Sequence, residues 1–161
     1  MNFQSIPVPT KGQQYFVIRH FSRADYPSGM KVGKLLHTRY RVNDLEKTVK
    51  FYKDVLGLVE LRRHKSPRGS ELVFMQAADS RELIELCSFP GSGPVQVQAD
   101  LTHLAFEVES LDGFARHLAS LGLKYSDGPT MRTGGGGFAF LDAPEGYEIE
   151  LIEQAKGKEW A

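Results

Sequence analysis

The chain has 161 residues, which is enough for one ordinary domain or for two very small modules that share a core. Its apolar content of 41% and charged content of 25% are typical of a globular protein, so a disordered or fibrous chain is excluded. The 20 basic and 20 acidic residues give a formal net charge of zero, and no dense basic run appears, which argues against nucleic-acid binding.

No segment of the sequence suggests a membrane or an oxidising compartment. The apolar stretches are far shorter than a membrane span. The first residues, MNFQSIPVPTKG, lack the charged start and the continuous apolar run of a signal peptide. The single cysteine, Cys87, cannot form a disulfide within the chain, which fits a reducing compartment. We therefore expect a soluble cytoplasmic protein.

Residues 1–33 form an N-terminal extension that has no counterpart in the repeat described below. A strand-like run, residues 13–21, lies between Pro9 and Pro27. We interpret this extension as an arm that lays one strand against the body of the protein or against a partner subunit.

The first module, residues 34–90, opens with a strand expected at residues 35–42. A helix follows, for which Asn43 is the expected N-cap and Glu46 completes a capping box. Gly57 marks the expected end of this helix, because glycine tolerates the backbone conformation that ends many helices. Three short strands are then expected at residues 59–63, 71–77 and 82–88.

A linker rich in glycine, proline and glutamine, residues 91–100, leads to the second module, residues 101–154. Ser110 can cap the helix of this module, and Gly122 ends it. The strands are expected at residues 102–108, near Lys124, at 137–141 and at 147–152. Both modules thus have the order β-α-β-β-β, and a tail of residues 155–161 follows. The predicted fold class is α+β, with two repeats that form a curved mixed sheet.

The second module repeats the first at an offset of 65 or 66 residues. The segments LLHTRYRV and LTHLAFEV align His37 with His103, and the segments LIEL and EIEL align Glu85 with Glu150. Because side chains alternate along a strand, each His and each Glu lies on the face opposite the apolar, helix-covered one. Two such copies can converge on a shared centre. The predicted metal ligands are His37, Glu85, His103 and Glu150.

Several metals are compatible with two imidazoles and two carboxylates. A polar strand face that meets water would explain any one of the histidines, but the recurrence of both residue types in both copies favours a shared site. The donor set suits nickel, cobalt, zinc, iron or manganese. Four ligands could fill a tetrahedral structural zinc site, although such sites usually favour cysteine. They could equally hold an octahedral ion with two open positions, which a catalytic metal needs.

With these residues placed, the chain resembles the vicinal oxygen chelate superfamily, and within it most resembles bacterial glyoxalase I (lactoylglutathione lyase). The resemblance covers about residues 34–153 and rests on the motifs LLHTRYRV, FYKDVLGL, LIELCSF, LTHLAFEV and APEGYEIELIE. It implies the glyoxalase/bleomycin-resistance/dioxygenase fold and one divalent metal ion per site, with nickel or cobalt favoured and zinc possible. It also implies a homodimer whose sites are shared between the first module of one chain and the second module of its twin.

The resemblance implies a reaction as well. The substrate would be the hemithioacetal of methylglyoxal, an α-oxoaldehyde, with a thiol such as glutathione, and the product a 2-hydroxyacyl thioester. Glu150 matches the chief base of the family, and Glu85 could serve on the other side of the substrate. Arg41 and Arg132 fall at or near positions that contact glutathione. Phe89 replaces an asparagine that helps to hold the glutathione backbone, so the resemblance does not fix which thiol is used.

Two other functions remain as alternatives. Acyl-CoA epimerases of the superfamily also carry out metal-assisted proton transfer, but they typically have glutamine where this chain has Glu85. Some relatives bind drugs without catalysis, and these generally lack the four ligands. Extradiol dioxygenases and fosfomycin-resistance enzymes use only three protein ligands.

Overall fold

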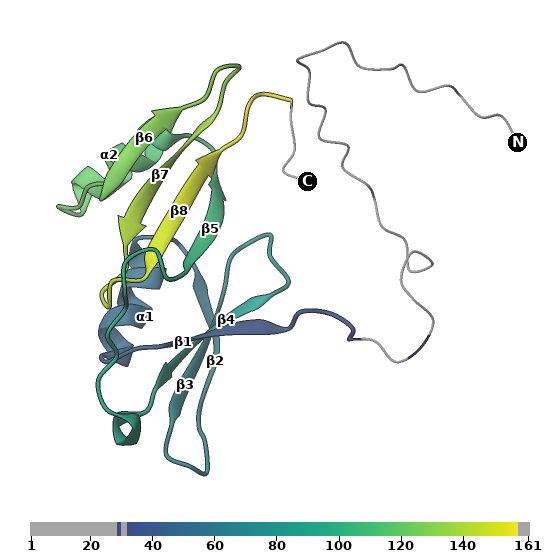
Figure 1. The fold of residues 1–161 in the computed structure, drawn as a ribbon, viewed down its shortest axis with the longest axis vertical. Coiled ribbons are helices and arrows are strands. Elements are labelled where there is room, and N and C mark those ends of the chain that lie inside the picture. The colour runs from purple at the N-terminus through teal and green to yellow at the C-terminus, as the bar shows by residue number, and fades with distance from the viewer. Residues whose placement is uncertain (1–28, 30–31, 158–161) are drawn as a thin grey trace, which may run out of the picture. The chain divides into compact units, whose positions relative to one another are not determined.

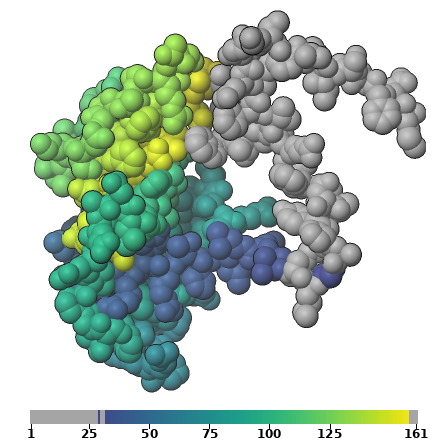
Figure 2. Space-filling model, in the orientation of Figure 1, coloured from purple at the N-terminus to yellow at the C-terminus, as the bar shows by residue number. Residues whose placement is uncertain are grey.

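The structure, a computed structural model, describes residue 29 and residues 32–157, which are drawn in colour in Figures 1 and 2. From Lys34 onward the described residues belong to one compact unit. The strand predicted at residues 13–21 lies outside the described residues, as do most of the predicted N-terminal extension and residues 158–161 of the predicted tail.

Two copies of a β-α-β-β-β unit follow one another along the chain, which confirms the predicted repeat and the α+β fold class (Figure 1). Within one chain, the described strands form two four-stranded sheets instead of one continuous sheet. The first unit comprises β1 (His37–Arg41), α1 (Leu45–Asp54), β2 (Val59–Lys65), β3 (Glu71–Gln76) and β4 (Leu83–Ser88). The short 3-10 helix η2 (Pro90–Ser92) follows it. The second unit comprises β5 (His103–Val108), α2 (Leu111–Ser120), β6 (Asp127–Met131), β7 (Gly137–Asp142) and β8 (Glu148–Glu153).

The strand order is β1-β4-β3-β2 in the first sheet and β5-β8-β7-β6 in the second. In each sheet the first and last strands of the unit run parallel to each other, and the other neighbours are antiparallel. The parallel pairing brings together residues that are 46 positions apart in the sequence, such as Arg39 and Glu85. It also leaves β1 and β5 as edge strands, with no strand neighbour on their outer side among the described residues.

The apolar side of each helix packs on one face of its sheet. In α1, Val49 and Tyr52 are buried, and the helix contacts β2, β3 and β4. Ile84 and Leu86 of β4 belong to the same buried cluster, so Glu85 between them lies on the opposite face. This confirms the predicted division of the sheet into a helix-covered apolar face and an open face, called the ligand face below. Neither of the two described helices is long and apolar enough to cross a membrane.

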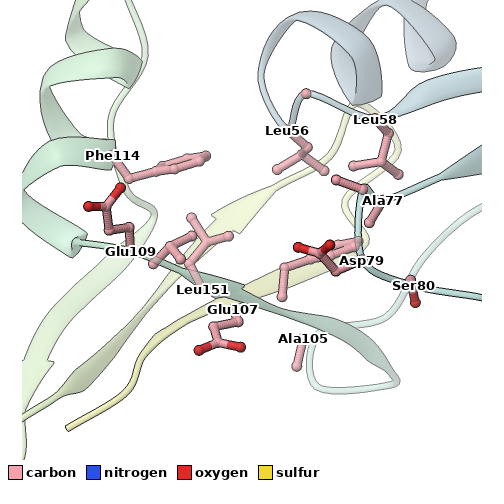
Figure 3. A pocket seen from close by; sticks show the side chains of 14 residues that line it. Leu56, Leu58, Ala77, Asp79, Ser80, Ala105, Glu107, Glu109, Phe114 and Leu151 are labelled. Atoms are coloured by element: carbon pink, nitrogen blue, oxygen red, sulfur yellow. The ribbon is translucent and has the colours of Figure 1, made fainter. Parts of the chain in front are cut away.

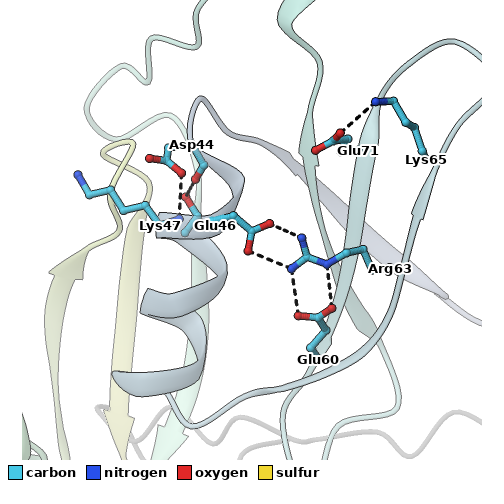
Figure 4. Close-up of polar contacts among 8 residues, drawn as sticks. Asp44, Glu46, Lys47, Glu60, Arg63, Lys65 and Glu71 are labelled. Atoms are coloured by element: carbon cyan, nitrogen blue, oxygen red, sulfur yellow. Dashed lines mark hydrogen bonds and ion pairs between the residues drawn. The ribbon is translucent and has the colours of Figure 1, made fainter.

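The N-terminus of α1 differs from the prediction by one residue. Asp44, and not Asn43, is the N-cap, and its carboxylate accepts a hydrogen bond from a backbone N–H of the first turn at 3.0 Å. Asn43 is not available for this role because its side-chain amide exchanges two hydrogen bonds with the backbone of Val95 in the linker. Glu46, expected to complete a capping box, instead pairs with Arg63 of β2 (Figure 4).

In the second unit the predicted helix cap is confirmed and one predicted strand position is wrong. Ser110 is the N-cap of α2, and its hydroxyl accepts a hydrogen bond from a first-turn N–H at 3.2 Å. The strand expected near Lys124 begins only at Asp127. The intervening segment packs toward α2, because the Tyr125 hydroxyl donates to the Leu111 carbonyl at 2.7 Å.

Both ends of α1 are held by the second module. The Glu145 carboxylate, in the turn between β7 and β8, accepts hydrogen bonds from two backbone N–H groups just before the helix at 3.2 and 3.4 Å. It also accepts one from the Thr48 hydroxyl at 2.8 Å. At the other end, the Val55 carbonyl oxygen lies 3.0 Å from Nε2 of His117 in α2. These contacts satisfy backbone groups that a helix leaves open at its ends.

Candidate metal centre

His37 and Glu85, the predicted ligands of the first module, lie side by side on the ligand face of the first sheet. His37 begins β1 and Glu85 lies within β4, and the parallel pairing of these strands brings the two together. The distance from His37 Nε2 to Glu85 Oε2 is 3.2 Å. The Glu85 side chain is 3% exposed and the His37 side chain 39%, so the carboxylate is buried and the imidazole lies at the surface.

His103 and Glu150 repeat this arrangement on the second sheet. His103 Nε2 lies 3.4 Å from Glu150 Oε2, and the side chains are 48% and 17% exposed. Each imidazole meets a phenylalanine ring edge to face, with ring centroids 5.5 Å apart for His37 and Phe74 and 6.1 Å apart for His103 and Phe140. The same His–Glu pair therefore occurs twice, in the same strand register and against the same kind of ring.

The two pairs do not meet within one chain. Among the described residues, no group of three or more His, Cys, Asp or Glu side chains lies close enough to hold a metal ion. A single chain thus presents the four predicted ligands as a first half-site, His37 with Glu85, and a second half-site, His103 with Glu150. Two donors alone leave at least half of the coordination positions of a transition-metal ion unfilled.

The first half-site contains a contact that we did not predict from the sequence. Arg39 follows His37 by two residues on the same face of β1, and its Nε donates a hydrogen bond to Glu85 Oε1. Ala105 holds the equivalent position in β5, opposite Glu150. Alternation along β1 places Arg39 on the same face as His37, but its partner becomes clear only from the strand register.

Apolar side chains surround Glu85 on the ligand face. Leu72, Phe74 and Cys87 form a buried cluster, against which Phe89 packs. Burial raises the pKa of the Cys87 thiol above its usual value, so the thiol is protonated at neutral pH. Cys87 therefore contributes an apolar group to the first half-site.

Arg41, predicted to contact substrate, reaches toward the linker. Its guanidinium donates to the Gly93 carbonyl at 2.5 Å, and its buried Nε has no hydrogen-bond partner in the part of the chain that the structure describes. Arg41 and Phe89 line the same pocket, of about 200 Å³, together with residues of the linker. Arg41 is expected to hold the thiol portion of the substrate, and Phe89 replaces the expected asparagine. These two residues thus line one pocket.

Arg132, the second arginine predicted to contact substrate, lies in the turn between β6 and β7. Its backbone N–H donates to the Gly136 carbonyl at 2.9 Å, and its guanidinium carbon lies 5.4 Å from the ring centroid of Phe138. Phe138 shares the ligand face of β7 with Phe140, which is opposite Glu150. Arg132 therefore lies on the ligand face of the second sheet, and its contact with substrate stays a prediction.

A pocket of about 800 Å³ lies between the two modules and contains none of the four predicted ligands (Figure 3). Leu56, after α1, lies on one side of it, and Phe114 of α2 and Leu151 lie on the other. Carboxylates, among them Glu107 and Asp79, contribute its charged groups, and its described lining residues include no His, Lys or Arg. This pocket lacks the groups that would hold an anionic substrate.

Comparisons with known proteins identify the family. Residues 34–151 match the family described as the Glyoxalase/Bleomycin resistance protein/Dioxygenase superfamily. A probable lactoylglutathione lyase from Synechocystis sp. is 34% identical over 129 residues, which cover 78% of this chain and 98% of that protein. The lactoylglutathione lyase of Haemophilus influenzae is 32% identical over 129 residues, which cover 78% of this chain and 96% of that protein.

A solved structure shows the same fold. Glyoxalase I from Zea mays superposes with a TM-score of 0.65 at 28% identity, and the match covers 76% of this chain and 45% of that one. The family match spans most of the chain, and it begins at the first module and ends within β8. This chain therefore belongs to the glyoxalase/bleomycin resistance protein/dioxygenase superfamily.

Proposed function

We propose that this protein is a metal-dependent isomerase of the glyoxalase I type. It converts the hemithioacetal of an α-oxoaldehyde, such as methylglyoxal, and a thiol into a 2-hydroxyacyl thioester. The observation that carries this proposal is the repeated His–Glu pair, held in the same register on two sheets. The relatives named lactoylglutathione lyase, which are 34% and 32% identical over nearly their whole length, support the same type of reaction.

The donor set fits a divalent transition-metal ion. Imidazole and carboxylate groups suit nickel, cobalt and zinc, and both pairs lie on the sheet face that the helices leave open. When bound, the ion supplies Lewis-acid polarisation of the substrate oxygens and offsets the negative charge that develops on them. The residues that would hold the ion are His37, Glu85, His103 and Glu150.

We propose that each site is built by two chains. The half-sites stay apart within one chain, and β1 and β5 both have a free outer edge among the described strands. In a two-fold dimer, the β1 edge of one chain could pair with the β5 edge of its twin. This pairing would cover the open edges and bring a first half-site next to a second half-site. Each dimer would then contain two sites, each with one His–Glu pair from either chain.

In this proposal Glu150 moves the proton between neighbouring carbon atoms of the substrate. Its side chain is 17% exposed, against 3% for Glu85, so it has the easier access to a bound molecule. Arg41 and Arg132 would meet the thiol portion. Because Phe89 and its apolar neighbours provide no amide for a peptide backbone, we expect the protein to bind glutathione adducts loosely.

The direct test is ultraviolet detection of thioester formation. The purified protein is loaded with nickel, cobalt or zinc in turn and given methylglyoxal with glutathione, then with other cellular thiols. Turnover that requires both metal and thiol would support the proposal, whereas an acyl-CoA epimerase or a binding protein would produce no thioester here. If the protein retains its metal but shows no turnover with any combination of metal and thiol, the proposed reaction is contradicted.

A mixing experiment tests the shared site independently. His37→Ala damages the first half-site and Glu150→Ala the second, so each homodimer is expected to be inactive. A heterodimer of these two variants would contain one intact site, and random exchange should restore about a quarter of the wild-type activity. His37→Ala mixed with Glu85→Ala is the matched control, because both changes damage the first half-site and no intact site can form. Equal activity of the two mixtures, with heterodimers detected by mass spectrometry, would contradict sharing.

A further inference from the structure

The two half-sites differ beside the glutamate. Arg39 is the strand-register partner of Glu85 in the first sheet, and Ala105 is the register partner of Glu150 in the second. The two positions are equivalent in the repeat, because each follows the histidine of its half-site by two residues. The repeat therefore places a cation next to one glutamate and a methyl group next to the other.

Arg39 gives the Glu85 carboxylate a second fixed contact. Its Nε donates to Glu85 Oε1, while His37 Nε2 lies 3.2 Å from Oε2, so each carboxylate oxygen has its own partner. The Glu85 side chain is 3% exposed, which leaves little room for water to replace either contact. Among the described residues, Glu150 has His103 at 3.4 Å and no arginine or amide donor.

We propose that Arg39 is a positioning residue that divides the work between the two glutamates. It holds Glu85 in place as a fixed ligand, while Glu150, next to Ala105, is free to turn away and move the proton. A carboxylate that serves as both ligand and base has to detach as substrate arrives, and a hydrogen bond from a permanently charged guanidinium opposes this movement. The inference rests on the proposed isomerase function and assigns roles within it.

Two simpler roles for Arg39 predict different results. Its side chain is 54% exposed, so a purely structural ion pair would contribute little to stability and would not affect catalysis. An arginine that binds the anionic part of a substrate would raise KM when it is removed and would leave metal affinity unchanged. A positioning residue changes metal affinity and the identity of the base.

The first measurement is metal affinity, by calorimetric titration of the metal-free protein with nickel. Arg39→Met removes the donor and keeps the apolar stem, and Arg39→Lys keeps a charge and one donor. Arg39→Met should weaken nickel binding by about tenfold or more, as is usual for partners of metal ligands, and Arg39→Lys should lose less. Circular dichroism and thermal melting check that both variants fold, which is expected for a half-exposed side chain.

The second measurement is turnover in a Glu150→Gln background, at saturating metal. In this variant the remaining site carboxylate is Glu85, which Arg39 restrains. Adding Arg39→Met should release it and raise the residual turnover by about tenfold, part of the 10²–10⁴ that a positioned base contributes. The converse variant, Ala105→Arg, places a donor beside Glu150 at a position that is exposed in the single chain, and should lower kcat without weakening nickel binding.

The proposal fails if Arg39→Met binds nickel as tightly as the wild type and does not raise the turnover of Glu150→Gln. A failure of the isomerase function itself looks different, because the wild type would then bind nickel and turn over no substrate. In that case the order of nickel affinities among wild type, Arg39→Lys and Arg39→Met still decides whether Arg39 fixes Glu85.

Discussion

The two modules share one order of strands, yet they differ in how far each depends on the other. α2 is capped from within its own module, by Ser110 and by Glu153, whose carboxylate accepts a hydrogen bond from the Leu111 N–H at 2.8 Å. α1 has Glu145 at its N-terminus and His117 at its C-terminus, and both come from the second module. α1 thus has contacts from the second module at both ends in addition to its own N-cap, Asp44, whereas the capping contacts of α2 come from its own module.

The glutamates of the two half-sites also differ. Glu85 is buried and held by Arg39, whereas Glu150 is more exposed and lies opposite Ala105. The shared strand register places both carboxylates at equivalent positions. The side chains around them then give them different exposure and different hydrogen-bond partners. A repeated fold can thus supply two ligands of one kind and still give them unequal freedom to move.

The largest effect is expected when the two glutamates are compared directly. Glu150→Gln should lower kcat by roughly 10²-fold or more at saturating metal, because the proposed base is lost. Glu85→Gln should act mainly through weaker metal retention, so raising the nickel concentration should recover part of its activity. The measurement is kcat against nickel concentration for both variants. If both variants lose kcat equally and added nickel restores neither, the proposed difference between the two glutamates is contradicted.

The helix ends offer a smaller, structural test of the comparison. Glu145→Ala removes the hydrogen bonds at the start of α1 and should lower the free energy of unfolding by about 1–3 kcal/mol. Hydrogen exchange should quicken in α1 more than in α2. Glu153→Ala is the matched control, because it removes a hydrogen bond at the start of α2 whose acceptor belongs to the same module as the helix. Unchanged protection of α1 in Glu145→Ala would show that the contact between modules is unimportant.

The effect of Phe89, which packs against the apolar residues of the first half-site, can be tested with different thiol substrates. Phe89→Asn supplies the amide that the family resemblance expects and should raise kcat/KM for glutathione adducts by about fivefold, the value of roughly one neutral hydrogen bond. The matched variant is Gln154→Asn at the equivalent position of the repeat, which should leave glutathione use unchanged. A gain that appears with every thiol would point to general opening of the pocket instead of recognition of glutathione.

The smallest effect concerns Cys87, whose equivalent in the second module is Ile152. Burial raises the pKa of this thiol, and the thiolate is the reactive form, so alkylation of the native protein at neutral pH should be slow. The rate should rise only as the pH passes above the usual thiol pKa. Iodoacetamide labelling followed by mass spectrometry measures this, with the denatured protein as reference. Equal rates in both states would show that the first half-site is open to solvent.

Local patterns in the sequence were sufficient to predict most of the fold. Alternation along the strands placed each His and each Glu on the face away from the helix, and the buried residues confirm this. Gly57 and Gly122, predicted to end the helices, both have φ of +72°, a conformation that favours glycine. These features depend on neighbours in the chain, so periodicity and turn residues reveal them.

Features that depend on distant contacts were not predictable in the same way. Asn43 and Asp44 are both good N-cap residues, and the choice between them is made by Val95, 52 residues after Asn43. The partner of Arg39 follows from the register of a parallel strand pair. The meeting of the four ligands requires a second chain in our proposal, which a single sequence does not contain.

The contact between Thr48 and Glu145 also has a consequence for synthesis of the protein. These residues are 97 positions apart, so a ribosome that adds about 5–20 residues each second needs roughly 5–20 s to travel from one to the other. During this interval all strands of the first sheet have been made, while the start of α1 has its own N-cap, Asp44, but still lacks the contacts from Glu145. One of the last turns to be made thus adds the final hydrogen bonds to the start of the first helix.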